Sequence, residues 1–95
     1  MKANTWAMIR SALAINKAAN MVGSESYLAK ILKVSKQILN YWKLYTLIPF
    51  HKAMETYIAT NGRVHLIELR PDLKCVIEKY NKLIIDEYKK SIGLI

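Results

Sequence analysis

Hydrophobic residues recur at three- and four-residue steps along most of this chain, which is the spacing of one face of an α-helix. Residues 5–22 carry the first such pattern, with Thr5 as a candidate N-cap and Gly23 as the residue that ends the helix. The apolar positions at helical spacing in this stretch are Ile9, Ala12, Leu13, Ala19 and Val22. The pattern predicts an amphipathic first helix that packs on a core.

A second, shorter helix is predicted from Ser24, its candidate N-cap, to about Lys33. Ala29 is small enough for another helix to cross closely at that point. The residues expected to face inward are Tyr27, Leu28, Ile31 and Leu32.

A tight turn at residues 33–35 leads to a third predicted helix, SKQILNYWK, over residues 35–43. Ser35 is its candidate N-cap. We expect Ile38, Leu39 and Trp42 to face the core, and Trp42 to be a core residue rather than a base-stacking platform. The polar residues left on the outside are Lys36, Gln37, Asn40 and Lys43.

The remainder of the chain is also predicted to be helical. Pro49 suits the start of a fourth helix over residues 50–60, which Asn61 and Gly62 end in the left-handed conformation. Residues 63–71 fit either an extended segment or one turn of helix. A last helix is predicted from Asp72, a candidate N-cap, to about Ser91. The expected fold class is therefore all-α, with five helices.

Positive charge is concentrated in the first half of the chain. The net charge is +8, and residues 1–54 hold eight basic residues against a single acid, Glu25. A surface that binds a polyanion needs such a concentration, because each contacted phosphate releases condensed counterions. Lysine-rich composition alone has a second explanation, since AT-rich coding sequences also favour lysine.

Several other classes of protein are disfavoured. The single cysteine, Cys75, excludes an internal disulfide and is expected to be a buried or half-buried reduced thiol. No apolar run approaches the roughly 20 residues needed to span a bilayer, and Arg10 and Lys17 interrupt any signal-peptide core. We therefore expect a cytoplasmic protein that does not span a membrane.

Catalysis and cofactor binding are not indicated. His51 and His65 lie fourteen residues apart without a metal-binding pattern, so we expect neither a metal nor another cofactor. There is no glycine-rich phosphate loop, no nucleophile elbow and no pair of acids in a recognisable catalytic setting. Arg70 and Asp72 are expected to form a local ion pair or to cap the last helix. We expect a protein that is not an enzyme.

The run LAKILKVSKQILNYWK, followed by IP and then by NGRV and LRPD, resembles the YdaS and Cro-like group of phage-type repressors. The resemblance covers residues 23–72 and implies a lambda repressor-like helix-turn-helix domain over residues 1–72, with residues 73–95 as a C-terminal helical extension. It implies a sequence-specific DNA-binding transcriptional regulator, with double-stranded DNA as its partner. The same resemblance implies that the protein is bacterial or phage-encoded and associated with the nucleoid. Similar proteins usually have glycine where this chain has Lys33, because that turn position tends towards positive φ.

By the docking logic of this fold, the start of the third helix meets base edges in the major groove. The matching positions are Lys36, Gln37, Asn40 and Tyr41. Candidates for phosphate contact are Ser24, Ser26, Ser35, Lys43, Tyr45 and His51. The alternative is that these residues form only a solvated polar face.

The apolar stripe of the last helix can pack on the chain's own core or on a second subunit. The candidate dimerisation residues are Leu73, Val76, Ile77, Tyr80, Leu83, Ile84 and Tyr88. A homodimer would place two recognition helices about 34 Å apart, one turn of DNA. Two rival hypotheses remain open: an antitoxin whose residues 73–95 neutralise a toxin partner, and a helical protein-interaction module that binds acidic protein instead of DNA.

Overall fold

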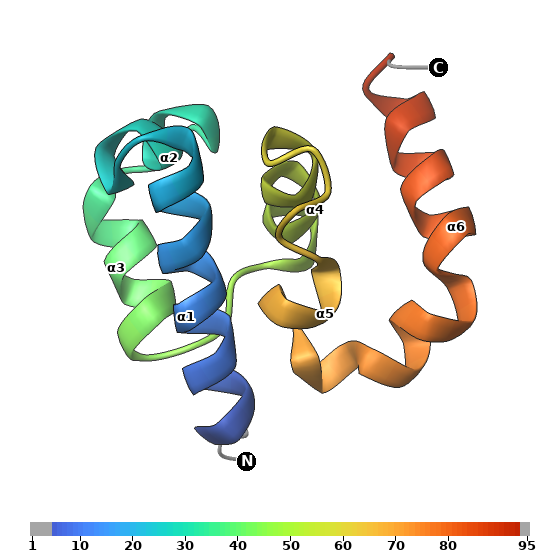
Figure 1. The fold of residues 1–95 in the computed structure, drawn as a ribbon, viewed down its shortest axis with the longest axis horizontal. Helices are drawn as coiled ribbons and strands as arrows, with labels where there is room; N and C mark the ends of the chain where they lie inside the picture. Colours follow the sequence, from blue (N-terminus) through green and yellow to red (C-terminus); the bar gives the residue numbers. More distant parts are fainter. Residues whose placement is uncertain (1–4, 94–95) are drawn as a thin grey trace.

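The computed structural model describes residues 5–93, and every regular element in that range is a helix (Figure 1). The prediction of an all-α protein is confirmed. The segment 63–71, which fitted two conformations, contains a short helix and leads into a 3₁₀ turn. The elements are α1 (Thr5–Val22), α2 (Glu25–Ile31), α3 (Lys36–Leu44), α4 (Phe50–Ala59), α5 (Leu66–Leu69), η1 (Pro71–Leu73) and α6 (Lys74–Ser91).

The predicted caps at the starts of α2 and α3 are confirmed. The Ser24 hydroxyl oxygen accepts a hydrogen bond from the Tyr27 N–H at 3.1 Å, and the Ser35 hydroxyl accepts one from the Ile38 N–H at 3.1 Å. Each bond satisfies a backbone donor that the first turn of a helix cannot satisfy itself. Pro49 is the residue before α4, as its fixed φ favours.

The C-terminal end of α4 is also determined by its local sequence. Asn61 and Gly62 have φ values of 54° and 79°, so the predicted left-handed end of α4 is confirmed. The N–H of Gly62 bonds the Tyr57 carbonyl at 2.8 Å and that of Asn61 bonds the Ile58 carbonyl at 3.0 Å, which is the Schellman pattern. The chain therefore turns sharply out of α4 towards α5.

A reciprocal cap starts the four-residue helix α5. His65 Nδ1 accepts a hydrogen bond from the Ile67 N–H at 3.2 Å, while the Glu68 carboxylate accepts one from the His65 N–H at 2.8 Å. Lys17 of α1 also bonds Glu68, at 3.2 Å. Burial acts to raise the pKa of Glu68, but these hydrogen bonds and the lysine outweigh it, so the pKa lies below 4.5. The three-residue spacing from His65 to Glu68 could have indicated the start of this helix in the sequence.

Asp72 does not cap the last helix. That prediction is wrong: α6 begins at Lys74 and has no side-chain cap. The Asp72 carboxylate instead accepts two hydrogen bonds from Arg70, at 2.9 and 2.8 Å, so the predicted local ion pair is confirmed. Arg70 lowers the pKa of Asp72 below 3.8 against the effect of burial. The same guanidinium donates to the Ile48 carbonyl at 3.1 Å and so fixes the loop after α3 to the segment before α6.

The core lies where α1 meets α2, α3 and α5. The buried side of α1 is made almost entirely of small residues, and it consists of Ala7, Ser11, Ala14, Ile15, Ala18 and Ala19. Ile9 and Leu13, two of the apolar positions at helical spacing, do not face the core, since they are 51% and 63% exposed. Small side chains let the neighbouring helices approach α1 closely, so the alanine side is covered and the larger side chains are left outside.

The inward faces of α2 and α3 are narrower than predicted. Leu28, Ala29 and Leu39 are buried as expected, together with Leu32 and Trp42. Tyr27 and Ile38 were also expected to face inward, and they are instead 52% and 44% exposed. Because α1 covers only one strip of each short helix, neighbouring apolar positions remain in solvent.

The last helix, α6, lies beside α4 and α5 at one side of the molecule (Figure 1). Ile77 and Ile85 are buried in the common core, and Leu73, Ile84 and Tyr88 pack against it. Three residues of the apolar stripe stay exposed: Val76, Tyr80 and Leu83. The boundary predicted at residue 72 falls within η1.

Candidate nucleic-acid interface

The turn between α2 and α3 closes with the Schellman pattern. The Val34 N–H bonds the Ala29 carbonyl at 3.0 Å, and the Lys33 N–H bonds the Lys30 carbonyl at 3.1 Å. This pattern places Lys33 in the left-handed region, and its φ of 58° confirms the predicted positive value. A residue with a β-carbon adopts that conformation at a cost of roughly 1 kcal/mol. The turn thus fixes how α3 leaves α2.

The four predicted base-contact residues share one side of α3. Lys36, Gln37 and Tyr41 are exposed, and Asn40 is half-buried between them. Residues four apart in a helix lie above one another, so Lys36 pairs with Asn40 and Gln37 with Tyr41 along the axis. The structure therefore brings these donors and acceptors together on one outward surface.

The predicted phosphate contacts lie around this surface, but one of them is already engaged. Ser24, Ser26 and Ser35 are exposed at the starts of α2 and α3. Lys43 is only 13% exposed, and its Nζ lies 2.9 Å from Glu25 Oε2 and 2.9 Å from Asn16 Oδ1. Its charge therefore links α3 to α2 and α1.

Two aromatic candidates lie at the other end of α3. Tyr45 is 69% exposed, and its ring centroid lies 5.8 Å from that of Tyr41. His51, in the first turn of α4, is exposed. Both side chains are accessible at the loop that follows α3.

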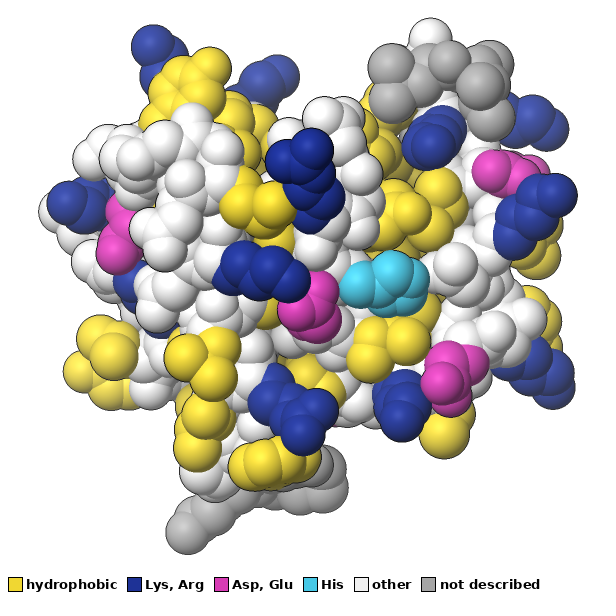
Figure 2. All heavy atoms as spheres, in the orientation of Figure 1, with side chains coloured by type: hydrophobic (Ala, Val, Ile, Leu, Met, Phe, Trp, Pro, Cys, Tyr) yellow, Lys and Arg dark blue, Asp and Glu magenta, His cyan; other side chains and the backbone are white. Residues whose placement is uncertain are grey.

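Exposed lysines also flank the turn, and sequence reasoning missed Lys30. Lys30, Lys33 and Lys36 recur every three residues, and all three are exposed. Among residues 5–93, none of them has a carboxylate within ion-pair distance. Basic side chains project from the α2 end of the molecule in Figure 2. The spacing of the three lysines was visible in the sequence and could have identified this cationic edge.

The remaining candidate chemistry has structural explanations. The His65 ring caps α5 and meets the Tyr57 ring edge-on, with centroids 5.7 Å apart. Within residues 5–93, no three His, Cys, Asp or Glu side chains are grouped closely enough to hold a metal ion. Cys75 is exposed, so the expectation of a buried or half-buried thiol is wrong. None of the helices described is both long and apolar enough to cross a bilayer.

Comparison with protein families gives a match. Searches of curated proteins and of solved structures returned none. A family model described as bacterial toxin YdaS matches residues 15–76, which run from the middle of α1 to the first turn of α6. The match covers more than half of the chain and includes the whole of α2, the turn and α3. The chain therefore belongs to the YdaS bacterial toxin family.

Proposed function

We propose that this protein is a non-enzymatic, sequence-specific DNA-binding regulator that places α3 in the major groove and represses transcription by occluding a promoter. One observation carries the proposal. Lys36, Gln37 and Asn40 share the outward side of α3, while Leu39 and Trp42 hold the opposite side in the core. A helix held in this way presents its polar groups in a fixed geometry, as base recognition requires.

The chemistry of the α3 surface suits base edges. The amides of Gln37 and Asn40 can each donate to and accept from adenine N6 and N7, and the Lys36 ammonium can donate to guanine O6 and N7. Lys30 and Lys33 add mobile charge for phosphates, and the N–H groups at the starts of α2 and α3 add fixed donors. The proposal includes two further statements. The elements α2, the turn and α3 form a helix-turn-helix, and this motif docks on DNA as lambda repressor-like domains do.

Selection of bound duplexes from a random pool tests the function and returns a site. On that site we expect Gln37→Ala or Asn40→Ala to lose roughly 1–3 kcal/mol of binding free energy, with little change on unrelated DNA. Cys75→Ser, an exposed substitution on α6, is the matched control and should bind as the wild type does. Failure to bind any duplex at low salt would exclude DNA binding. Equal binding to heparin and to the selected site would favour the protein-interaction module.

The proposal extends to a twofold dimer through the outer side of α6. Val76, Tyr80 and Leu83 lie at positions i, i+4 and i+7 and remain exposed while Ile77 and Ile85 are buried. We expect Leu83→Lys to give a monomer in sedimentation experiments and to weaken binding to a palindromic site. If the wild-type chain is monomeric at the concentrations used for DNA binding, α6 serves the core alone.

A second candidate function follows from the family's description as a toxin. We propose that an excess of the chain arrests bacterial growth because it occupies many DNA sites. Induced expression of the wild type should stop growth, and Gln37→Ala with Asn40→Ala should relieve the arrest at equal protein level. Arrest that persists in this double variant would assign the toxicity to another surface. Growth without arrest, with a neighbouring gene product co-purifying through residues 73–95, would favour the antitoxin hypothesis.

A further inference from the structure

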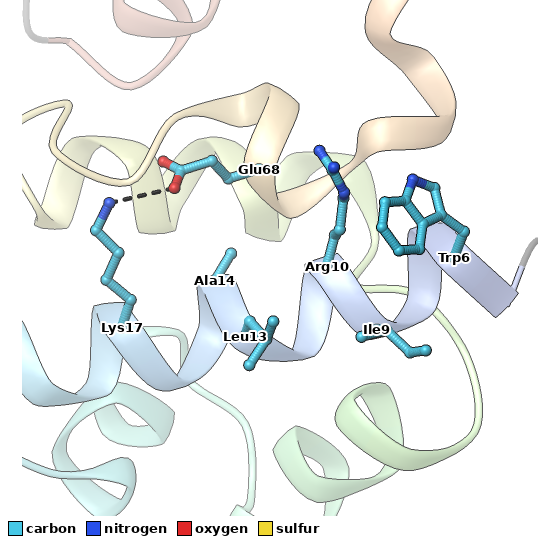
Figure 3. Close-up of a pocket in the computed structure, with 7 residues that line it drawn as sticks. All are labelled: Trp6, Ile9, Arg10, Leu13, Ala14, Lys17 and Glu68. Carbon is cyan, nitrogen blue, oxygen red and sulfur yellow. Dashed lines mark hydrogen bonds and ion pairs between the residues drawn. The ribbon is translucent and has the colours of Figure 1, made fainter.

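The outer side of the N-terminal half of α1 exposes large apolar side chains. Trp6, Ile9 and Leu13 are 61%, 51% and 63% exposed and lie at positions i, i+3 and i+7. They line a groove of about 430 Å³ that continues over Ala14 to Glu68 of α5 (Figure 3). None of the helices described covers this side. The exposed apolar residues on this side of α1 have the spacing of a surface that packs against a helix.

The apolar surface continues on the other flank of α1. A second groove, of about 290 Å³, lies between Ile9, Leu13 and the end of α3, where Leu44 is 65% exposed. In Figure 2, hydrophobic and basic side chains lie next to one another over the lower half of α1. Monomeric proteins rarely expose large contiguous apolar patches, and those that are rimmed by polar residues often mark interaction sites.

The rim of the first groove is positively charged. The Arg10 guanidinium lies 4.5 Å from the centroid of the Trp6 ring, and the two side chains point to the α5 side together (Figure 3). Stacking on the ring leaves the N–H groups at the edge of a guanidinium able to donate to a carboxylate. Among residues 5–93, no carboxylate forms an ion pair with Arg10. One end of the groove therefore carries a cation without a counter-charge.

The other end of the groove carries Lys17, which is half exposed and bonds Glu68 at 3.2 Å. Arg10 and Lys17 are seven residues apart, which is roughly 10 Å along a helix axis. The same distance separates positions i and i+7 of a second helix laid alongside. Two acids at that spacing could therefore face both cations at once.

We propose that this side of α1 docks an amphipathic helix of a protein partner, one that has apolar residues at i, i+3 and i+7 and acidic residues along its flanks. Charge disfavours one alternative, the face-to-face pairing of two α1 helices from two copies of the chain. No acidic residue occurs in α1, so two α1 helices packed face to face would bring Arg10 and Lys17 of both copies together. Like charges held together in this way disfavour the pair.

The inference goes beyond DNA binding because it concerns a different surface. The helices α1 and α3 run in opposite directions (Figure 1), so the N-terminal half of α1 lies beside Leu44, at the end of α3. Lys36 and Gln37 lie at the start of α3. The partner helix and DNA can therefore bind at the same time, and the two sites can be tested separately.

The test uses a synthetic helical peptide with leucines at i, i+3 and i+7 and glutamates on both flanks, and a counterpart with lysine in place of every glutamate. Titration into the ¹⁵N-labelled full chain should shift the Trp6 indole signal and the amides around Arg10 and Leu13. The lysine peptide should bind at least about tenfold more weakly, because it meets like charge.

Substitutions on the exposed rim make the test specific. Leu13→Lys should lower the affinity for the glutamate peptide by roughly tenfold or more. Arg10→Glu should lower the same affinity by roughly fivefold. Glu68→Gln should tighten binding, because it frees Lys17 while glutamine can still complete the cap of α5. Ile92→Lys, at an exposed apolar position just after α6 and outside every surface proposed above, is the matched control and should change nothing. Thermal unfolding of each variant verifies that it is folded.

Three results would overturn the proposal. The first is equal affinity for the glutamate and lysine peptides, or none for either. The second is signal shifts centred on α6 or on the start of α3. The third is wild-type self-association that Leu13→Lys abolishes, because the occupant would then be a second copy of the chain.

Discussion

Lys43 Nζ lies 2.9 Å from Glu25 Oε2, and this ion pair joins the last turn of α3 to the first turn of α2. The same ammonium donates to Asn16 of α1 at 2.9 Å. Three helices thus converge on one half-buried cation beside the proposed DNA surface. The contact orients α3 while removing one lysine from the charge available to phosphates.

Substitution of two lysines should separate these roles. Lys36→Gln should reduce the slope of log affinity against log salt by about 1, because one phosphate contact is lost. Lys43→Gln should leave the slope unchanged and lower the free energy of unfolding by roughly 1 kcal/mol, as expected for a partly buried ion pair. Salt titration of DNA binding and urea unfolding measure the two quantities. A smaller slope for Lys43→Gln would instead assign this lysine to phosphate contact.

Removal of the cap of α3 should destabilise the protein. Ser35→Ala leaves the Ile38 N–H without its partner and should cost roughly 1 kcal/mol, or about 4–8 °C in Tm. Ser26→Ala is the control, because Ser26 is exposed in the first turn of α2 and makes no cap bond. Equal melting temperatures for the two variants would show that the Ser35 hydroxyl bond contributes nothing to stability.

Relief of the left-handed turn should stabilise the protein. Lys33→Gly removes the steric cost of a β-carbon at φ 58° and should raise the free energy of unfolding by up to roughly 1 kcal/mol. Asn61→Gly, at φ 54°, should raise the free energy of unfolding by less, because asparagine tolerates this conformation better than lysine does. Denaturant unfolding of the two variants and the wild type measures both changes in the free energy of unfolding. A larger gain at Asn61 would contradict the strain assigned to Lys33.

Stability should fall in acid because two carboxyl groups have lowered pKa values. The folded pKa values of Glu68 and Asp72 lie below 4.5 and 3.8. A group with a lower pKa in the folded state stabilises the fold above its unfolded pKa, and that contribution disappears as the pH falls through the folded value. We therefore expect the free energy of unfolding to decline from about pH 5 downwards.

Glu68→Gln provides the matched comparison for this pH dependence. The variant should unfold more easily at neutral pH and lose less stability between neutral pH and acid, since only the Asp72 contribution remains of the two. Urea unfolding at several pH values measures the difference. Identical pH profiles for variant and wild type would show that the Glu68 contacts do not affect stability.

The features predicted correctly are those that neighbouring residues determine. Ser24 and Ser35 cap helices, and Lys33, Asn61 and Gly62 take positive φ, because each outcome depends on a few adjacent residues. The side of α1 that is buried could not be predicted in the same way. Isoleucine and leucine on one side and alanine on the other both fit helical spacing, and only the approach of α2, α3 and α5 decides between them.

The candidate DNA-binding site likewise has features that could be predicted from neighbouring residues and features that could not. The outward position of Lys36, Gln37 and Asn40 follows from the spacing of α3 and was predictable. The engagement of Lys43 was not, because its partner Asn16 lies 27 residues away in the sequence. The docking side of α1 could not be predicted for the same reason, because helical spacing alone does not show which apolar residues of α1 are exposed.

The two tryptophans of this chain lie in opposite environments, 61% exposed for Trp6 and 7% for Trp42. An indole in water emits at longer wavelength than one in a dry interior, and soluble quenchers reach it more easily. Trp6 emission should therefore report occupancy of the α1 groove, while Trp42 emission should report the integrity of the core beneath α3. A single fluorescence spectrum, recorded without any label, can thus distinguish a docked partner from an unfolded chain.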